Sequence, residues 1–274
     1  MAVGTRPGRG GSQVVARRRR RPSAPFDLVV GRNSVLAALG AGTRTVHTVI
    51  VDRAGGGEAV DEIRRLARAV GAELNVVEGR ELTKLAGGDF HQGVAAYVDK
   101  KPTPMWEELV AGPQAGRPFV VLDHVEDPRN LGSVVRSAAA FGAGGVFFPP
   151  RRQVQVTPSV TKVAEGGLEY VPVVPVANVA QFLKQIKEAG IWCYGLEADG
   201  EARMAELEFD RSAAFVLGGE GVGLSAPARK ECDVVVAIPL ADNVTSLNVA
   251  AAAAVTLYEF RRQHSLAGAV DRKG

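Results

Sequence analysis

Three stretches in the second half of the 274-residue chain combine glycine, amide, carboxylate and guanidinium groups in patterns that suit ligand binding. Each lies at the end of a short apolar run of the kind that forms a buried strand. The carboxyl ends of parallel strands meet at one edge of a sheet, and ligands bind beyond that edge. We therefore expect the three stretches to form one site. They are DPRNLGSVVRSAAAFGA (127–143), VLGGEGVGLS (216–225) and IPLADNVTSLNVAAAAAVTLYEF (238–260).

The middle stretch is a glycine-rich loop. Gly218, Gly219, Gly221 and Gly223 surround Glu220, and glycines allow a backbone to approach a ligand closely or to adopt positive φ. Their spacing fits neither the dinucleotide fingerprint G-x-G-x-x-G nor the phosphate loop G-x-x-x-x-G-K-[ST], which argues against a nicotinamide dehydrogenase. The loop predicts a backbone-lined pocket for a flat, polar ligand. A plain glycine turn, with Glu220 in solvent, is the alternative.

The other two stretches place polar side chains at or near the starts of helices. Asn130 begins a predicted helix over 130–141, and Arg136 lies off its apolar stripe, where a guanidinium can clamp a phosphate. Ser246 and Asn248 stand at the start of a predicted alanine-rich helix over 247–262, where hydroxyl and amide groups cap free backbone N–H groups. A solvated arginine and a capped core helix are the structural alternatives.

Composition excludes several kinds of chemistry and partner. Cys193 and Cys232 lie in apolar, strand-like surroundings, which indicates buried thiols in a reducing, cytoplasmic compartment. No cysteine nucleophile, Ser–His–acid set or cluster of metal ligands stands out, so we expect positioning and proton removal without a metal. No apolar run reaches the ~18 residues of a membrane span, so no membrane partner is expected.

Short strands alternate with helices along the chain, which predicts an α/β protein with two domains. Residues 27–100 are typical of a small α/β sandwich, and residues 101–117 form a linker rich in proline and glycine. Residues 118–264 predict a parallel sheet covered on both faces. The ends, 1–26 and 265–274, are expected to be a disordered arm and a tail. His91 is either an RNA contact or a loop residue with local hydrogen bonds.

The three stretches resemble, in order and internal pattern, the signature motifs of the SpoU (TrmH-type) branch of the SPOUT RNA methyltransferases. The resemblance runs from Phe119 to Gln263. It continues in the first domain, which is similar to the L30e-like domain of the bacterial 23S rRNA guanosine 2′-O-methyltransferase subgroup. The residues that carry this second match are Gly31-Arg32-Asn33-Ser34-Val35 and His91-Gln92-Gly93-Val94.

The resemblance implies a trefoil knot at the carboxyl ends of the sheet, an S-adenosyl-L-methionine cofactor, an RNA substrate and a homodimer. Arg136, from the same or the partner subunit, would assist deprotonation of the target 2′-hydroxyl or stabilise the developing oxyanion. Arginine keeps its proton up to pH ~12, and both roles stay open. The side chains expected to shape the catalytic site by hydrogen bonds are Asn130, Glu220, Ser246 and Asn248. The groups expected to hold the cofactor are Leu217, Gly218, Gly219, Ile238, Leu240 and Leu247.

The RNA substrate stays open between 23S rRNA, which the first domain favours, tRNA, and rRNA methylated for antibiotic resistance. A non-catalytic RNA-binding protein of ribosome assembly is a further alternative. We would expect such a protein to have lost Arg136, Asn248 or the glycine loop, and all three are present.

The charge of the chain is concentrated at one end. Residues 1–26 carry seven arginines and no acidic residue, although the net charge of the whole chain is only +3. An arm of this kind adds a salt-dependent attraction to phosphates.

Deleting residues 1–26 should therefore weaken RNA binding mainly at low salt. The measurement is the Kd for RNA at several salt concentrations, and we expect a flatter dependence of log Kd on log salt after truncation. Equal slopes for the full-length and truncated chains would contradict this role of the arm.

Overall fold

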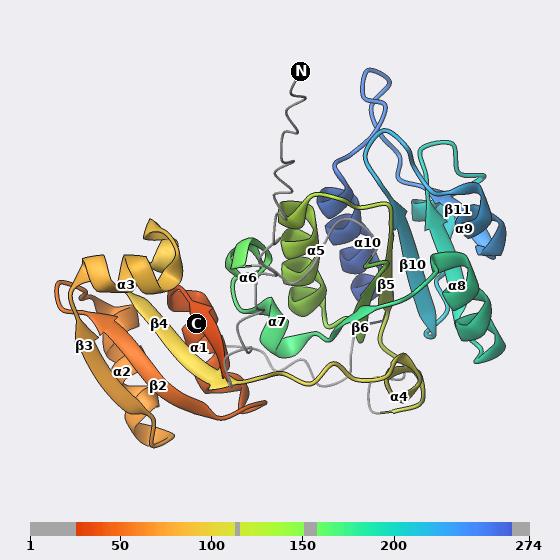
Figure 1. Cartoon of the computed structure of the whole chain (residues 1–274). Helices are drawn as coiled ribbons and strands as arrows, with labels where there is room; N and C mark the ends of the chain where they lie inside the picture. The colour runs from red at the N-terminus through yellow and green to blue at the C-terminus, as the bar shows by residue number, and fades with distance from the viewer. Residues whose placement is uncertain (1–25, 113–115, 151–157, 265–274) are drawn as a thin grey trace, which may run out of the picture.

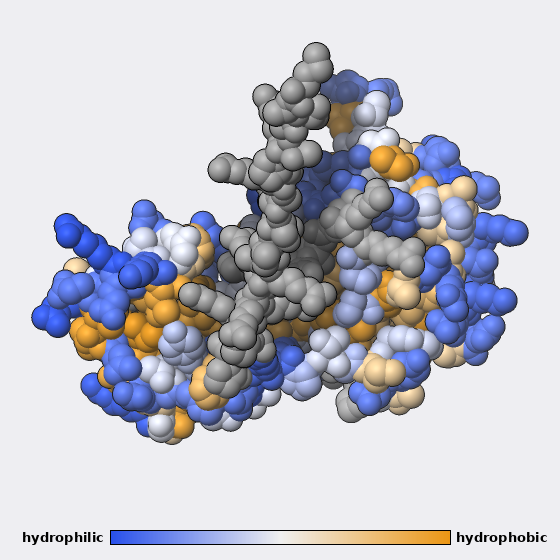
Figure 2. Space-filling model, in the orientation of Figure 1, coloured by the Kyte–Doolittle hydropathy of each residue, from blue (hydrophilic) through white to orange (hydrophobic). Residues whose placement is uncertain are grey.

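The computed structural model describes residues 26–112, 116–150 and 158–264, which contain two β-sheets, each with helices packed on it (Figure 1). The expected arm and tail lie outside the described residues, except for Phe26. Hydrophilic residues cover most of the periphery of both halves (Figure 2). Every helix in the described part of the chain is too short or too polar to span a membrane.

The N-terminal sheet has four strands in the order β1-β4-β2-β3. β4 pairs antiparallel with β1 and β2, and β3 pairs parallel with β2. Its strands are β1 (Phe26–Val30), β2 (Val46–Asp52), β3 (Glu73–Val77) and β4 (Val94–Asp99). Its helices are α1 (Arg32–Ala41), α2 (Glu58–Ala69), α3 (Gly79–Ala86) and the short 3₁₀ helix η1 (Asp89–His91).

Helices cover both faces of this sheet. Val35 of α1 and Ile63 of α2 are fully buried with Val49 and Val51 of β2 on one face. Leu82 of α3 packs on the other face with Ile50. The buried His91 ring has local partners, because its Nδ1 accepts from the Gly93 N–H at 3.0 Å and its Nε2 lies 3.0 Å from Thr83 Oγ1.

The C-terminal sheet has seven strands in the order β7-β6-β5-β10-β8-β11-β9, and every pairing is parallel. This confirms the predicted α/β fold with a parallel sheet. The strands are β5 (Phe119–Asp123), β6 (Gly145–Phe148), β7 (Val173–Pro175), β8 (Trp192–Leu196), β9 (Ala202–Arg203), β10 (Ala213–Gly218) and β11 (Val234–Ala237).

Strands of this sheet are buried on both faces. In β5, Val120 and Leu122 join one core cluster, while Phe119 and Val121 join the other. β10 divides in the same way, with Phe215 and Val216 on opposite faces. Side chains alternate between the faces of a strand, so continuous apolar runs are what a sheet between two helical layers requires.

Helices α5 and α10 lie side by side on one face of this sheet, and α8 lies on the other (Figure 1). The helices are α4 (Trp106–Ala111), α5 (Pro128–Phe141), α6 (Pro158–Ala164), α7 (Gly167–Tyr170), α8 (Val179–Glu188), α9 (Ala226–Glu231) and α10 (Val249–Gln263), with the 3₁₀ helix η2 (Met204–Glu206). Gly142 ends α5 in the left-handed conformation, as the sequence predicts.

Several elements differ from the sequence expectations. Helix α10 begins at Val249 and not at Leu247, because Asn248 is its N-cap. Helices α7 and α9 and the two-residue strand β9 were not expected, and each is too short to show a periodic pattern. Within residues 101–117, the brief helix α4 packs its buried Leu109 into the C-terminal core.

A buried ion pair joins the two halves. Arg44, which precedes β2, has only 8% of its side chain exposed, and Glu169 of α7 has 3%. Arg44 Nε donates to Glu169 Oε2 at 3.0 Å, and Thr43 Oγ1 donates to the same oxygen at 3.4 Å. Arg44 Nη1 also donates to Asp27 Oδ2 at 3.0 Å. Buried hydrogen bonds between charged groups are strong and directional, so this pair fixes how the two halves of the chain are oriented.

Replacing Glu169 with alanine should lower the free energy of unfolding by about 3 kcal/mol, because Arg44 then stays buried without its main partner. Urea unfolding followed by circular dichroism measures this loss. The matched control is Glu62→Ala, which breaks an exposed pair with Arg65 and should lower stability much less, because solvent screens a surface pair. Equal losses in the two variants would show that the buried pair contributes nothing beyond a surface pair.

Candidate functional site

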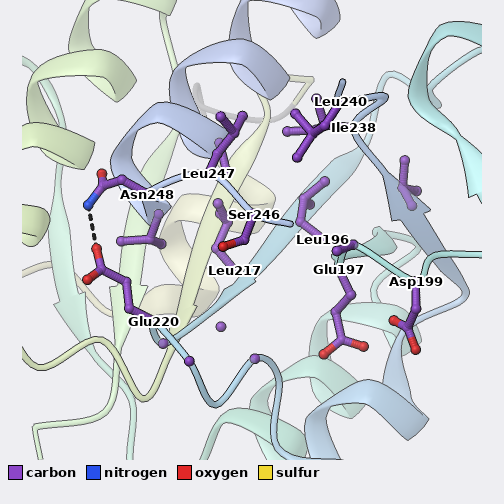
Figure 3. A pocket seen from close by; sticks show the side chains of 18 residues that line it. Leu196, Glu197, Asp199, Leu217, Glu220, Ile238, Leu240, Ser246, Leu247 and Asn248 are labelled. Carbon is purple, nitrogen blue, oxygen red and sulfur yellow. Dashed lines mark hydrogen bonds between the residues drawn. The ribbon is translucent and has the colours of Figure 1, made fainter. Parts of the chain in front are cut away.

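A cavity of about 660 Å³ opens beyond the carboxyl ends of β8, β10 and β11. These three strands are neighbours in the sheet, so the loops that follow them meet at one edge. Figure 3 shows their side chains around a common space. The cavity is lined by Leu196, Glu197, Ala198, Asp199, Leu217, Gly218, Gly219, Glu220, Gly221, Gly223, Val236, Ile238, Leu240, Ser246, Leu247, Asn248, Val249 and Ala252.

The glycine-rich loop after β10 folds tightly on itself. The Gly223 N–H donates to the Gly219 carbonyl at 2.9 Å. A Cβ on Gly218 would lie 2.1 Å from the carbonyl carbon of Gly223, and one on Gly219 would lie 2.3 Å from the His124 carbonyl oxygen. Both contacts are far too short for any side chain, so glycine is required here by packing of the loop. The compact loop leaves its backbone groups at the cavity wall.

A carboxylate joins the loops that surround the cavity. Glu220 Oε1 accepts a hydrogen bond from Asn130 Nδ2 at 3.0 Å and another from Asn248 Nδ2 (Figure 3 shows the second). Asn248 Nδ2 also lies 3.0 Å from Asn130 Oδ1, and Asn248 Oδ1 caps α10 by accepting from the Ala250 N–H at 2.9 Å. One network thus ties the start of α5, the glycine loop and the start of α10 together.

The structure adds two acidic residues that the sequence analysis missed. Glu197 and Asp199 follow β8 and line the cavity. Glu197 Oε1 accepts from the Leu224 N–H at 2.9 Å, and Arg229 pairs with both carboxylates. β8 lies between β10 and β11 in the sheet. Ligands bind beyond the carboxyl ends of parallel strands, so the loop after β8 was also a candidate. Its two acidic residues were the feature of the sequence that could have identified it.

Nine of the predicted residues line the cavity, and Asn130 and Arg136 do not. Asn130 reaches the rim through its bonds to Glu220 and Asn248. Arg136 faces a different cavity, where its Nη1 lies 2.9 Å from Glu165 Oε1 and its side chain is 59% exposed. Within one chain, therefore, the guanidinium stands apart from the pocket that the other predicted residues form.

Neither cysteine offers a nucleophile. Burial raises the pKa of Cys193 far above its ordinary value and raises the pKa of the Cys232 thiol to about 12. Both groups stay protonated near neutral pH, and the thiolate is the reactive form. Across residues 26–112, 116–150 and 158–264, no group of three or more His, Cys, Asp or Glu side chains is arranged to hold a metal ion. The polar side chains that line the cavity, among them Glu220, Ser246 and Asn248, suit hydrogen bonding and positioning.

A parallel α/β sheet with a partly apolar cavity beyond its strand ends defines a binding protein or enzyme for a small organic molecule. The model of the SpoU rRNA methylase family matches residues 117–258, and a model for RNA 2′-O ribose methyltransferase substrate binding matches residues 28–104. The chain belongs to the SpoU rRNA methylase family.

Individual relatives cover both halves of the chain. A protein of Xylella fastidiosa, named 23S rRNA (guanosine-2′-O-)-methyltransferase RlmB, is 37% identical over 87% of this chain and 97% of its own length. The protein of that name from Xanthomonas campestris is 35% identical over 86% and 96%. The crystal structure of the SpoU methyltransferase AviRb from Streptomyces viridochromogenes, in complex with AdoMet, is 28% identical with a TM-score of 0.70, covering 88% of this chain and 91% of that one.

Asn248→Ala removes one of the two amide groups that donate to the Glu220 carboxylate, so the glycine loop at the cavity wall should become less well fixed. We expect binding of S-adenosylmethionine, the ligand of the Streptomyces structure, to weaken roughly tenfold. The substitution should also cost about 1 kcal/mol of stability through the lost cap. Calorimetric titration and urea unfolding measure the two effects. Asn178→Ala is the matched control, because Asn178 caps α8 away from the cavity. We expect it to lose stability alone, and equal affinities in the two variants would contradict the role of the network.

Proposed function

We propose that the protein transfers the methyl group of S-adenosylmethionine to a ribose 2′-hydroxyl of RNA, with a guanosine of 23S rRNA as the target. The observation that carries this proposal is the cavity beyond β8, β10 and β11, whose wall holds the family's second and third motifs. The choice of 23S rRNA as substrate is supported by two relatives that are named as 23S rRNA methyltransferases and that match this chain over almost their whole length. Ribosomal RNA as substrate places the protein in the cytoplasm.

The cavity fits the cofactor by the chemistry of its wall. Leu217, Ile238, Leu240 and Leu247 offer apolar surface for a flat adenine, and backbone groups of the loop at Gly218 and Gly219 suit its polar edge. The carboxylates of Glu197 and Asp199 can accept hydrogen bonds from ribose hydroxyls. When bound, the cofactor supplies an activated methyl carbon. Holding it still is then the main task of these residues.

Arg136 acts on the other reactant. A guanidinium remains charged at neutral pH. It can hold the target ribose and stabilise negative charge on the 2′-oxygen as the hydroxyl proton passes to solvent water, which also assists deprotonation. Asn130, Glu220, Ser246 and Asn248 shape the space between the two reactants by hydrogen bonds. Methyl transfer of this kind depends on alignment of oxygen and methyl carbon at about 3–3.5 Å.

A homodimer would bring Arg136 to a cofactor pocket. Arg136 does not line the pocket of its own chain, so we propose that it reaches the ribose held at the partner subunit. Val255 and Tyr258 give α10 an exposed apolar side, with 41% and 57% of each residue accessible, which is available for such an interface.

The finer architecture belongs to the same proposal. The chain after β11 would be threaded as a trefoil knot. Residues 27–100 would form an L30e-like RNA-binding domain, joined by the linker 101–117 to a methyltransferase domain over 118–264. Residues 1–26 and 265–274, outside the described ranges except for Phe26, would be an arm and a tail.

The test is transfer of labelled methyl groups from S-adenosylmethionine to total RNA from a strain that lacks this gene, with the modified position mapped. We expect one 23S ribose to be labelled, and we expect Arg136→Ala to slow transfer by about a hundredfold, as loss of an oxyanion donor does. Arg65→Ala, which removes an exposed arginine paired with a glutamate on α2, is the control and should keep its rate.

Other outcomes would separate the alternatives. Transfer to tRNA would keep the mechanism and overturn the substrate. Cofactor binding without transfer to any RNA would favour a non-catalytic RNA-binding role. A labelled rRNA site at which methylation also protects growing cells from an antibiotic would identify a resistance enzyme.

A further inference from the structure

A second cavity, of about 360 Å³, lies between the two halves of the chain. Its wall combines the start of α1, Phe90 of η1 with Gln92 just after it, the middle of α5 and the end of α6. Ala250, in the first turn of α10, also lines it, while Val249 and Ala252 of the same helix line the first cavity. The two cavities therefore lie on either side of one helical turn.

The two N-terminal motifs meet in this wall. The Arg32 backbone N–H donates to Gln92 Oε1 and Arg32 Nε donates to the Gln92 carbonyl, both at 3.0 Å. The buried His91, held by Thr83 and Gly93, fixes the loop from the other side. These motifs are thus built into one surface that faces Arg136.

A carboxylate on the wall of this cavity pairs with groups from two of its sides. Glu165 Oε1 lies 2.9 Å from Arg136 Nη1 of α5, and Glu165 Oε2 accepts from Asn33 Nδ2 of α1 at 3.0 Å. Lys162 also lines the cavity, with its ammonium 5.1 Å from the centre of the Phe90 ring. The Glu165 carboxylate is therefore an oxyanion held by donors from both halves of the chain.

The cavity is a fixed feature, because the two halves are locked against each other next to it. A Cβ on Gly166 would lie 2.5 Å from Ala37 Cβ, so α1 packs directly on this turn. The buried Arg44–Glu169 pair follows three residues later. Lys101 Nζ donates to the Leu168 carbonyl between them.

We propose that this cavity binds a phosphodiester group of the substrate RNA, which takes the place of the Glu165 carboxylate. A phosphate presents oxygens to the same donors, and arginine binds it with a planar fork. The Glu165 side chain is partly exposed, so it can move into solvent when a negatively charged phosphate enters the cavity. Phosphate bound here, next to the first turn of α10, would hold the RNA at Arg136. This inference rests on the proposed function for the nature of its ligand.

The test measures direct binding of the full-length protein to unmodified 23S rRNA transcribed in vitro, by filter binding at several salt concentrations. Glu165→Gln removes the competing carboxylate, and we expect Kd at low salt to fall about threefold to fivefold. The slope of log Kd against log salt should steepen by about 0.7, as for one more phosphate contact with a single strand. Glu62→Gln is the matched control, since it frees Arg65 on α2 by the same change of charge.

A double-mutant cycle with Arg136→Gln gives the decisive comparison. If phosphate displaces Glu165 from Arg136, the gain from Glu165→Gln should disappear in the Arg136→Gln background. A gain that persists there, or a Glu165→Gln variant whose Kd matches that of Glu62→Gln, would overturn the proposal. Circular dichroism and S-adenosylmethionine binding show that each variant is folded.

Methyl transfer is measured in parallel, so that failure of the proposed function can be distinguished from failure of the proposal about the cavity. Absence of transfer by the wild-type protein counts against the proposed function, whereas the binding cycle still reports on the cavity. Under the proposal, Glu165→Gln lowers KM for RNA and leaves kcat unchanged.

Discussion

The hydrogen bonds of the Glu220 carboxylate to Asn130 and Asn248 are the interaction on which the candidate active site depends. The sheet brings strand ends to one edge, but it does not fix the loops that follow them. Those loops have few apolar groups with which to pack. One carboxylate that accepts from two amides joins three of them, and Asn248 passes the constraint into α10 through its cap. Charge-assisted bonds suit this task because they are short and directional.

The buried Arg44–Glu169 pair sets a second constraint, on the two halves of the chain. Such a pair loses much hydration on burial, so it adds less net stability than its short distances suggest. Its effect is on geometry, because a displaced partner would leave a charge buried and unpaired. Asp27, Thr43 and the Leu168 carbonyl bring further polar partners to this junction. The orientation that results places Asn33 of α1 opposite Arg136 of α5.

The sequence predicts much of this fold because the pattern is local. Apolar runs such as 119–122 and 213–217 belong to strands buried on both faces, and Asn248 and Gly142 mark helix ends by their own conformational preferences. The acidic loop after β8 follows a predicted strand, so the rule about strand ends applied to it. It was missed because only the order of the strands in the sheet shows that this strand end adjoins the pocket. The separation of Arg136 from the pocket likewise depends on tertiary packing. A helical pattern tells which side of α5 carries Arg136, but it does not tell what packs opposite.

The first turn of α10 connects these constraints. Asn248 caps it and joins the network of the first cavity, while Ala250, two residues later, faces the second. Asn248, which caps this turn, is itself held by Glu220, so the turn forms a rigid wall between the two cavities. Methyl transfer needs close alignment of the acceptor oxygen and the methyl carbon, since a misplacement of about 1 Å can slow such a reaction about a hundredfold. The groups that hold the two reactants must therefore not move independently. Because Arg136 is proposed to act at the partner subunit's pocket, the stiff turn of α10 links the cofactor cavity of one site to the RNA-holding cavity that serves the other. Anchoring the glycine loop and the helix start through one network therefore holds both sites of the dimer in place.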